Sequence, residues 1–164
     1  MNSYTQSAAT VVVLLLLSSC APSISSEARA DAQSVDSPVV VYNSYTTFAN
    51  TAGGRDYVLE LFNIGDRTIK YVLLDVELFN AVGDPEPGEI KNDSEAYLRV
   101  TGPLRPNELT SGRFENLYYS LSGECIEIHA IEIVYANNSM QRIVGDDVDR
   151  TFTVPERNDC SVDL

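Results

Sequence analysis

Residues 68–80 read TIKYVLLDVELFN and alternate apolar with polar side chains along most of their length. Asp75 and Glu77 share one face of this stretch, while Lys70 and Asn80 continue the opposite, apolar face beyond its core. The apolar face consists of Val72, Leu74, Val76 and Leu78. A period of two is typical of a strand with one face buried and one face in water. The stretch therefore predicts a half-buried β-strand.

Short runs of the same kind lie on both sides of this strand. Turns are expected between them at 52–54, 64–66 and 83–88, because Gly takes positive φ and Pro removes a ladder donor. No stretch keeps a helical period, and about eight short strands predict an all-β sandwich, with a small closed barrel as the alternative. The strand candidates are 38–48, 56–64, 68–80, 96–101, 112–120, 126–136, 140–144 and 151–154.

The longest late candidate changes phase halfway along. Ile126 and Ile128 have even numbers, whereas Ile131 and Ile133 have odd ones. One extra residue in a strand restores the side chains to the same face. The pattern therefore predicts a β-bulge near His129-Ala130.

An uncharged segment, residues 1–19, opens the chain and holds an apolar run from Val11 to Leu17. The run is too short to span a bilayer, which takes roughly 20 residues, and it fits a secretory signal peptide. Its end, Leu17-Ser18-Ser19-Cys20, resembles the lipobox of bacterial lipoproteins. That resemblance implies a lipid on Cys20 as the only membrane attachment. Because Ala21 follows, the outer membrane is preferred, with a periplasmic or surface-exposed domain.

An unlipidated signal, with Cys20 as an ordinary residue, is the alternative, since no Lys or Arg precedes the apolar run. Residues 20–37 hold few aliphatic and no aromatic side chains, so we expect the lipidated Cys and a flexible tether there. Residues 38–164 match the usual size of one domain and form the expected sandwich.

Two further cysteines, Cys125 and Cys160, remain after the predicted signal. Two thiols in an exported protein are more often a disulfide than a zinc site, because the compartment is oxidising and zinc usually takes three or four protein ligands. The composition therefore favours a Cys125–Cys160 bridge, with two separate thiols as the alternative.

Several separated blocks resemble the immunoglobulin-like, FxLYD-type domains of bacterial envelope lipoproteins. The blocks fall between residue 56 and about residue 144, in the family's order. They are Asn63, TIKYV at 68–72, FNAVGD at 79–84, VTGPL at 100–104 with Pro106, and IEIVY at 131–135. The resemblance implies an antiparallel sandwich of about 7–9 strands and carries over no catalytic or ligand residue. Independently of it, Asn63 and Asn80 can close turns through side-chain to backbone bonds.

Charge and side-chain chemistry limit the functions that the sequence allows. The formal net charge is −13, which opposes binding to nucleic acid, because such binding depends on Lys and Arg. His129 is the only histidine, and no Gly-x-Ser-x-Gly elbow occurs. We therefore expect no enzyme and no cofactor.

Two features leave room for a ligand. Asp146, Asp147 and Asp149 crowd one acidic loop and are candidate Ca²⁺ ligands, although solvated surface charge is the favoured explanation. Aromatic groups at 42–48 and 114–119 could contact glycan or protein, although sheet packing is the simpler explanation. We expect a non-enzymatic, lipid-anchored structural or interaction module with an unknown protein or glycan partner. The alternative is a Ca²⁺- or glycan-dependent binding lipoprotein.

Overall fold

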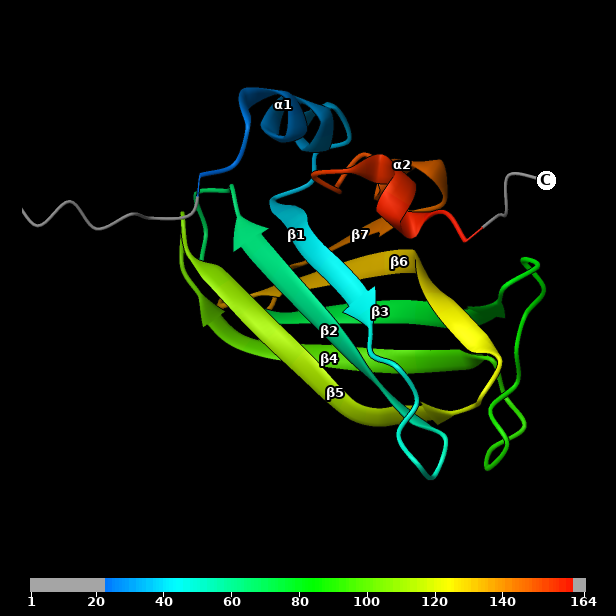
Figure 1. Ribbon diagram of the computed structural model, residues 1–164. Helices are drawn as coiled ribbons and strands as arrows, with labels where there is room; N and C mark the ends of the chain where they lie inside the picture. Colours follow the sequence, from blue (N-terminus) through cyan, green and yellow to red (C-terminus); the bar gives the residue numbers. More distant parts are fainter. Residues whose placement is uncertain (1–22, 161–164) are drawn as a thin grey trace, which may run out of the picture.

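Two antiparallel β-sheets pack face to face in the computed structural model, which describes residues 23–160 (Figure 1). The smaller sheet has the order β1-β2-β5 and the larger the order β4-β3-β6-β7. The chain changes sheets between β2 and β3, between β4 and β5 and between β5 and β6, as in immunoglobulin-like sandwiches. The strands are β1 (Val39–Thr46), β2 (Gly54–Asn63), β3 (Ile69–Asn80), β4 (Glu95–Leu104), β5 (Leu109–Tyr119), β6 (Gly123–Tyr135) and β7 (Met140–Val144). The predicted all-β sandwich is confirmed, with seven strands in the described part of the chain.

The apolar face of β3 forms the centre of the core, as its alternation predicts. Its even-numbered residues from Val72 to Leu78 are at most 1% exposed and pack with Tyr57 and Leu61 of β2. The prediction is wrong at Lys70, which is exposed, while Ile69 is fully buried. The register shifts between Ile69 and Tyr71, and this irregularity exchanges the faces.

The predicted bulge in β6 is confirmed. Asp75 of β3 pairs with Ala130 and Val76 pairs with Ile128, so His129 has no partner on β3. The side chain of His129 consequently points out of the sheet while apolar residues on both sides of it enter the core.

The predicted strand at 151–154 is wrong. Phe152 makes a single parallel bridge to Val41 of β1, beside helix α2 (Asp146–Asp149) and the 3-10 helix η1 (Pro155–Asn158). Thr151 and Thr153 nevertheless exchange backbone bonds with Val41, so this segment still covers the free edge of β1.

The predicted tether is also wrong from residue 25 onward. Ser25 caps helix α1 (Ser26–Ser34) by accepting a hydrogen bond from Ala28 N, 3.1 Å away. Helix α1 lies beside the start of β1 (Figure 1), and its Ala32 is fully buried there against the smaller sheet. Its neighbours there are Val40, Phe62 and Ile64. The folded unit therefore begins about a dozen residues before residue 38.

A candidate interaction surface around His129

The bulge places His129 between two open clefts on the larger sheet. One cleft, of about 420 Å³, lies between β6, α2 and η1. The other, of about 530 Å³, lies over β3 and the start of β4. His129 lines both clefts, and its Nε2 lies 3.1 Å from Glu77 Oε2.

The first cleft is shaped by the side chain of Asn158. Its Oδ1 accepts a hydrogen bond from Ile128 N at 2.7 Å, and its Nδ2 donates to Ile128 O at 3.1 Å. The same Nδ2 donates to Asp149 Oδ1 at 2.7 Å. Asn158 thus stands beside β6 where a neighbouring strand would pair, next to the end of β7 at Val144.

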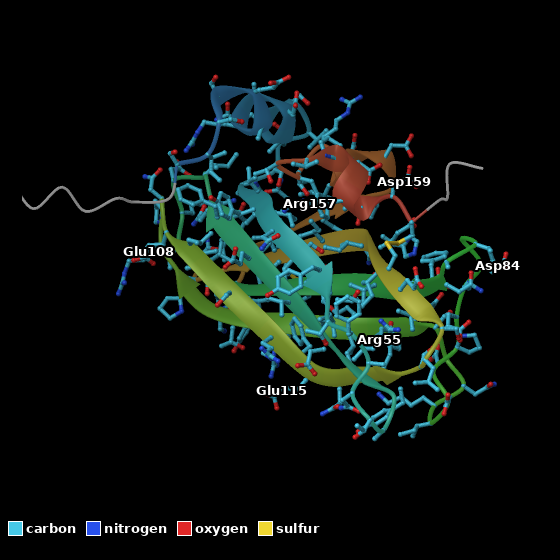
Figure 2. The ribbon with its side chains drawn as sticks, in the orientation of Figure 1. Arg55, Asp84, Glu108, Glu115, Arg157 and Asp159 are labelled. Atoms are coloured by element: carbon cyan, nitrogen blue, oxygen red, sulfur yellow. A yellow bond between two sulfur atoms is a disulfide. The ribbon has the colours of Figure 1, made fainter. Side chains whose placement is uncertain are left out.

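The predicted Cys125–Cys160 disulfide is confirmed, and Cys160 directly follows Asp159, which lines this cleft. The Cα atoms are 5.6 Å apart, and Cys160 N donates to Glu127 Oε1 at 2.7 Å. The bridge fastens the last described residue to the start of β6, and Figure 2 shows its sulfur atoms close to Asp159. The disulfide therefore fixes η1 and the cleft wall against the sheet.

The second cleft is held by hydrogen bonds between its own acidic side chains and their neighbours. Glu77 Oε1 accepts from Ser94 Oγ at 2.8 Å, and Asp75 Oδ2 lies 2.8 Å from Arg142 Nη2. Tyr97 is 63% exposed at the rim. Partial desolvation, with the carboxylates of Glu132 and Asp75, raises the pKa of Tyr97.

Carboxylates dominate both clefts. Among the described residues that line the two clefts, His129 is the only Lys, Arg or His, and the neighbouring Arg142 is bonded to Asp75. A concave surface of this charge attracts Lys, Arg or other cationic groups and repels phosphate. The acidic residues are Asp75, Glu77, Asp93 and Glu95 in the second cleft and Glu127, Asp146, Asp149 and Asp159 in the first.

The three aspartates proposed as Ca²⁺ ligands are not brought together. They lie on the single turn of α2, where Asp146 and Asp149 line the first cleft and Asp147 does not. Residues three apart share a helix face, whereas neighbours in sequence diverge by about 100°. In residues 23–160, no group of three or more His, Cys, Asp and Glu side chains is placed to hold a metal ion. The described structure therefore does not assemble the expected calcium site from these three aspartates.

The aromatic groups divide between packing and exposure. Tyr118 is 5% exposed, and Phe114 stacks on the buried Tyr57 at 6.3 Å, in agreement with sheet packing. Phe48, in contrast, is 96% exposed. Burial raises the pKa of Tyr57 to about 12, and the hydrogen bond with Ser44 opposes this shift.

Sequence reasoning identified His129, Asp146, Asp149 and the disulfide but missed most of the surface. Glu77, Glu95 and Asn158 come from three distant segments and converge only in the folded sandwich. The phase change of β6 was the one usable signal, since it places a polar side chain outside an otherwise regular strand. The lipidation candidate Cys20 lies outside the described residues.

The fold and the surface together define a class, an acidic seven-stranded immunoglobulin-like sandwich with a helix packed on its smaller sheet. No protein-family model, curated protein or solved structure matches the chain. The likeness to FxLYD-type domains therefore stays a prediction. Within residues 23–160, no helix has both the length and the hydropathy needed to cross a membrane.

Proposed function

We propose that this chain is a non-enzymatic lipoprotein of the bacterial cell envelope, held by a lipid on Cys20, whose sandwich binds a protein or glycan partner. The position of α1 supports the proposal most directly. Its cap, Ser25, comes five residues after Cys20, and the helix packs on the sandwich through Ala28 and Ala32. The folded module thus begins within roughly 18 Å of the proposed lipid, given about 3.5 Å per extended residue.

The charge of the module agrees with a partner other than nucleic acid. The formal net charge is −13, and the two clefts beside His129 are lined mainly by carboxylates. Phosphate polymers are repelled by such a surface, whereas cationic protein segments are attracted. The outer membrane is the preferred location, with the module in the periplasm or on the cell surface.

Metabolic labelling with radioactive palmitate tests the anchor. The full chain, expressed in a bacterial host, should carry the label, and Cys20→Ser should abolish it. Cys160→Ser is the matched control, because it removes a thiol and the disulfide but leaves the lipobox unchanged. Intact mass spectrometry should give residues 20–164 plus lipid, two hydrogens lighter before reduction than after. Continued labelling of the Cys20→Ser protein, or an unlipidated wild type, would overturn the proposal.

A further inference from the structure

Four of the most exposed large apolar side chains lie in loops at one end of the sandwich. We call this the distal end and define it as loops 47–53, 81–94 and 120–122. They join β1 to β2, β3 to β4 and β5 to β6, whereas α1 packs where β1 begins and β2 ends. Figure 2 shows Asp84 at the distal end and Glu108 at the opposite end. The exposed side chains are Phe48 (96%), Leu121 (70%), Ile90 (68%) and Val82 (65%).

These loops are fastened to one another. The guanidinium group of Arg55 donates to Ser120 O at 2.9 Å, to Leu121 O at 3.1 Å and to Thr47 O at 3.4 Å. The carboxylate of Glu86 accepts from the hydroxyls of Ser120 and Ser122. The exposed tips consequently stand on a shared, hydrogen-bonded base. Fixing loops in advance lowers the entropy cost of binding, as a docking surface requires.

The rim of the distal end is acidic. The four ion pairs found among the described residues involve none of these rim carboxylates. Lys91 is the exposed basic residue in these loops. Arg55, near the start of β2, is only 9% exposed, and its guanidinium group already donates to backbone carbonyls. The rim carboxylates are Asp84, Glu86, Glu89 and Asp93 in the loops, and Glu95 and Glu124 at the adjoining ends of β4 and β6.

The acidic rim also connects the distal end with the surface around His129. Asp93 and Glu95 line the second His129 cleft, and both residues also line a smaller hollow beside Ile90. Exposed apolar side chains together with carboxylates on the same loops complement a partner surface that combines apolar with basic side chains. A second copy of this chain and an anionic lipid surface are both negatively charged, so the acidic rim would repel them.

We propose that the distal end docks a basic protein, with Phe48, Ile90 and Leu121 entering an apolar patch and the acidic rim facing Lys and Arg. This inference rests on the proposed function in one respect. A lipid on Cys20 holds the α1 end near the membrane, so the distal end points away from it. The 12 residues of β3 place the two ends roughly 40 Å apart, at about 3.3 Å per residue.

A defined peptide pair tests the chemistry of this surface. The probes are two fluorescent 14-residue peptides of equal charge, one alternating Lys with Leu and one alternating Lys with Ser. Anisotropy with the full, vesicle-reconstituted protein should show about tenfold tighter binding of the Lys-Leu peptide. The double variant Phe48→Ser/Leu121→Ser should abolish that preference, whereas Met140→Ser, which changes a 62% exposed residue on the larger sheet, should keep it. Equal affinity for both peptides, or equal loss in both variants, would overturn the docking site.

Site-specific photocrosslinking in the native host tests the partner. Benzoylphenylalanine at position 48 should yield a protein adduct on illumination, and the same group at position 140 should not. The crosslinked peptide should be apolar with flanking Lys or Arg, and its yield should fall several-fold when salt rises from about 0.1 to 0.5 M. An adduct with lipid, with a second copy or with an acidic peptide would refute the inference, as would equal adducts at both positions. The intact mass of the same preparation reports the lipid separately, so a failed anchor and a failed docking site are distinguishable.

Discussion

The side chain of Asn158 pairs with the edge of β6 at a position where no neighbouring strand of residues 23–160 does so. Its amide pairs with both backbone groups of Ile128 beside the end of β7, and it is 7% exposed. Asn158→Ala leaves a buried N–H and a buried C=O unpaired, each at a cost of about 1–3 kcal/mol. We expect the free energy of unfolding to fall by roughly 2–4 kcal/mol in urea titrations. Asp149→Ala removes only one of the three bonds and should cost about 1 kcal/mol or less; an equal loss in both variants would contradict this role.

Asp56 makes part of the stability dependent on pH. The backbone N–H of Asn116 donates to its Oδ1, and this bond, with the hydrogen bonds from Arg113, lowers the pKa of Asp56 below 3.8. A lowered folded-state pKa means that the contribution is present above pH 3.8 and is lost as pH falls through the folded-state value. In urea unfolding, the stability difference between wild type and Asp56→Asn should therefore shrink below pH 3.8. A difference that stays constant with pH would exclude this titration.

The residues that could be predicted are those whose signal lies within their own segment. Asn63 Oδ1 accepts from Gly65 N at 2.9 Å and Asn80 Oδ1 from Val82 N at 3.0 Å, as expected for turn residues. The exposed position of His129 can be predicted from the phase change within a single strand, β6. Asn158 gives no such signal, because its partners lie 30 residues away in β6.

Helix α1 is the element that the composition concealed. An Ala-rich segment buries little apolar area, and the sequence therefore favoured a tether. A clue lay instead in Phe62 of β2 and in Ile64 just after this strand, two apolar residues that pack outside the main core and need a cover. Ala28 and Ala32, four residues apart, supply it with side chains small enough for close approach.

Docking of α1 can be tested by charging one of two alanines. Ala32→Asp places a carboxylate in a fully buried site and should lower the free energy of unfolding by at least about 2 kcal/mol. Ala30→Asp makes the same change on the exposed face of the same helix and should leave stability within about 0.5 kcal/mol. Hydrogen exchange should show loss of protection in residues 28–36 for Ala32→Asp alone. Similar losses in both variants would mean that helix propensity, not docking, is responsible.

At the scale of the whole molecule, the alternating pattern predicted two sheets but not how the chain connects them. The crossings from β2 to β3 and from β5 to β6 depend on contacts between distant parts of the chain. Asn63 Nδ2 donates to Leu104 O, and Thr46 Oγ1 donates to Glu124 O. These contacts join residues 41 and 78 positions apart. The acidic surface likewise joins separate segments, because its carboxylates come from β3, β4, β6 and α2, from the loop before β4 and from the residue after η1.

Crowding of carboxylates on one part of the molecule implies a stability that depends on salt. The formal net charge is −13, and like charges repel more weakly once the Debye length falls from roughly 10 Å at 0.1 M salt to about 3 Å at 1 M. The melting temperature should therefore rise by several degrees, about 2–4 °C for each kcal/mol, as NaCl increases over this range.

Two matched variants separate this charge effect from general salt effects. Glu95→Gln removes a rim carboxylate without an ion pair and should raise the melting temperature at low salt while reducing its salt dependence. Glu108→Gln removes the same charge at the α1 end. There the backbone N–H and the guanidinium group of Arg105 bond to Glu108 and lower the pKa of its carboxyl group. Because the charge of Glu108 is already balanced by Arg105, this variant should not raise the melting temperature. If both variants respond alike, the self-repulsion is spread evenly over the protein and the distal end is not its centre.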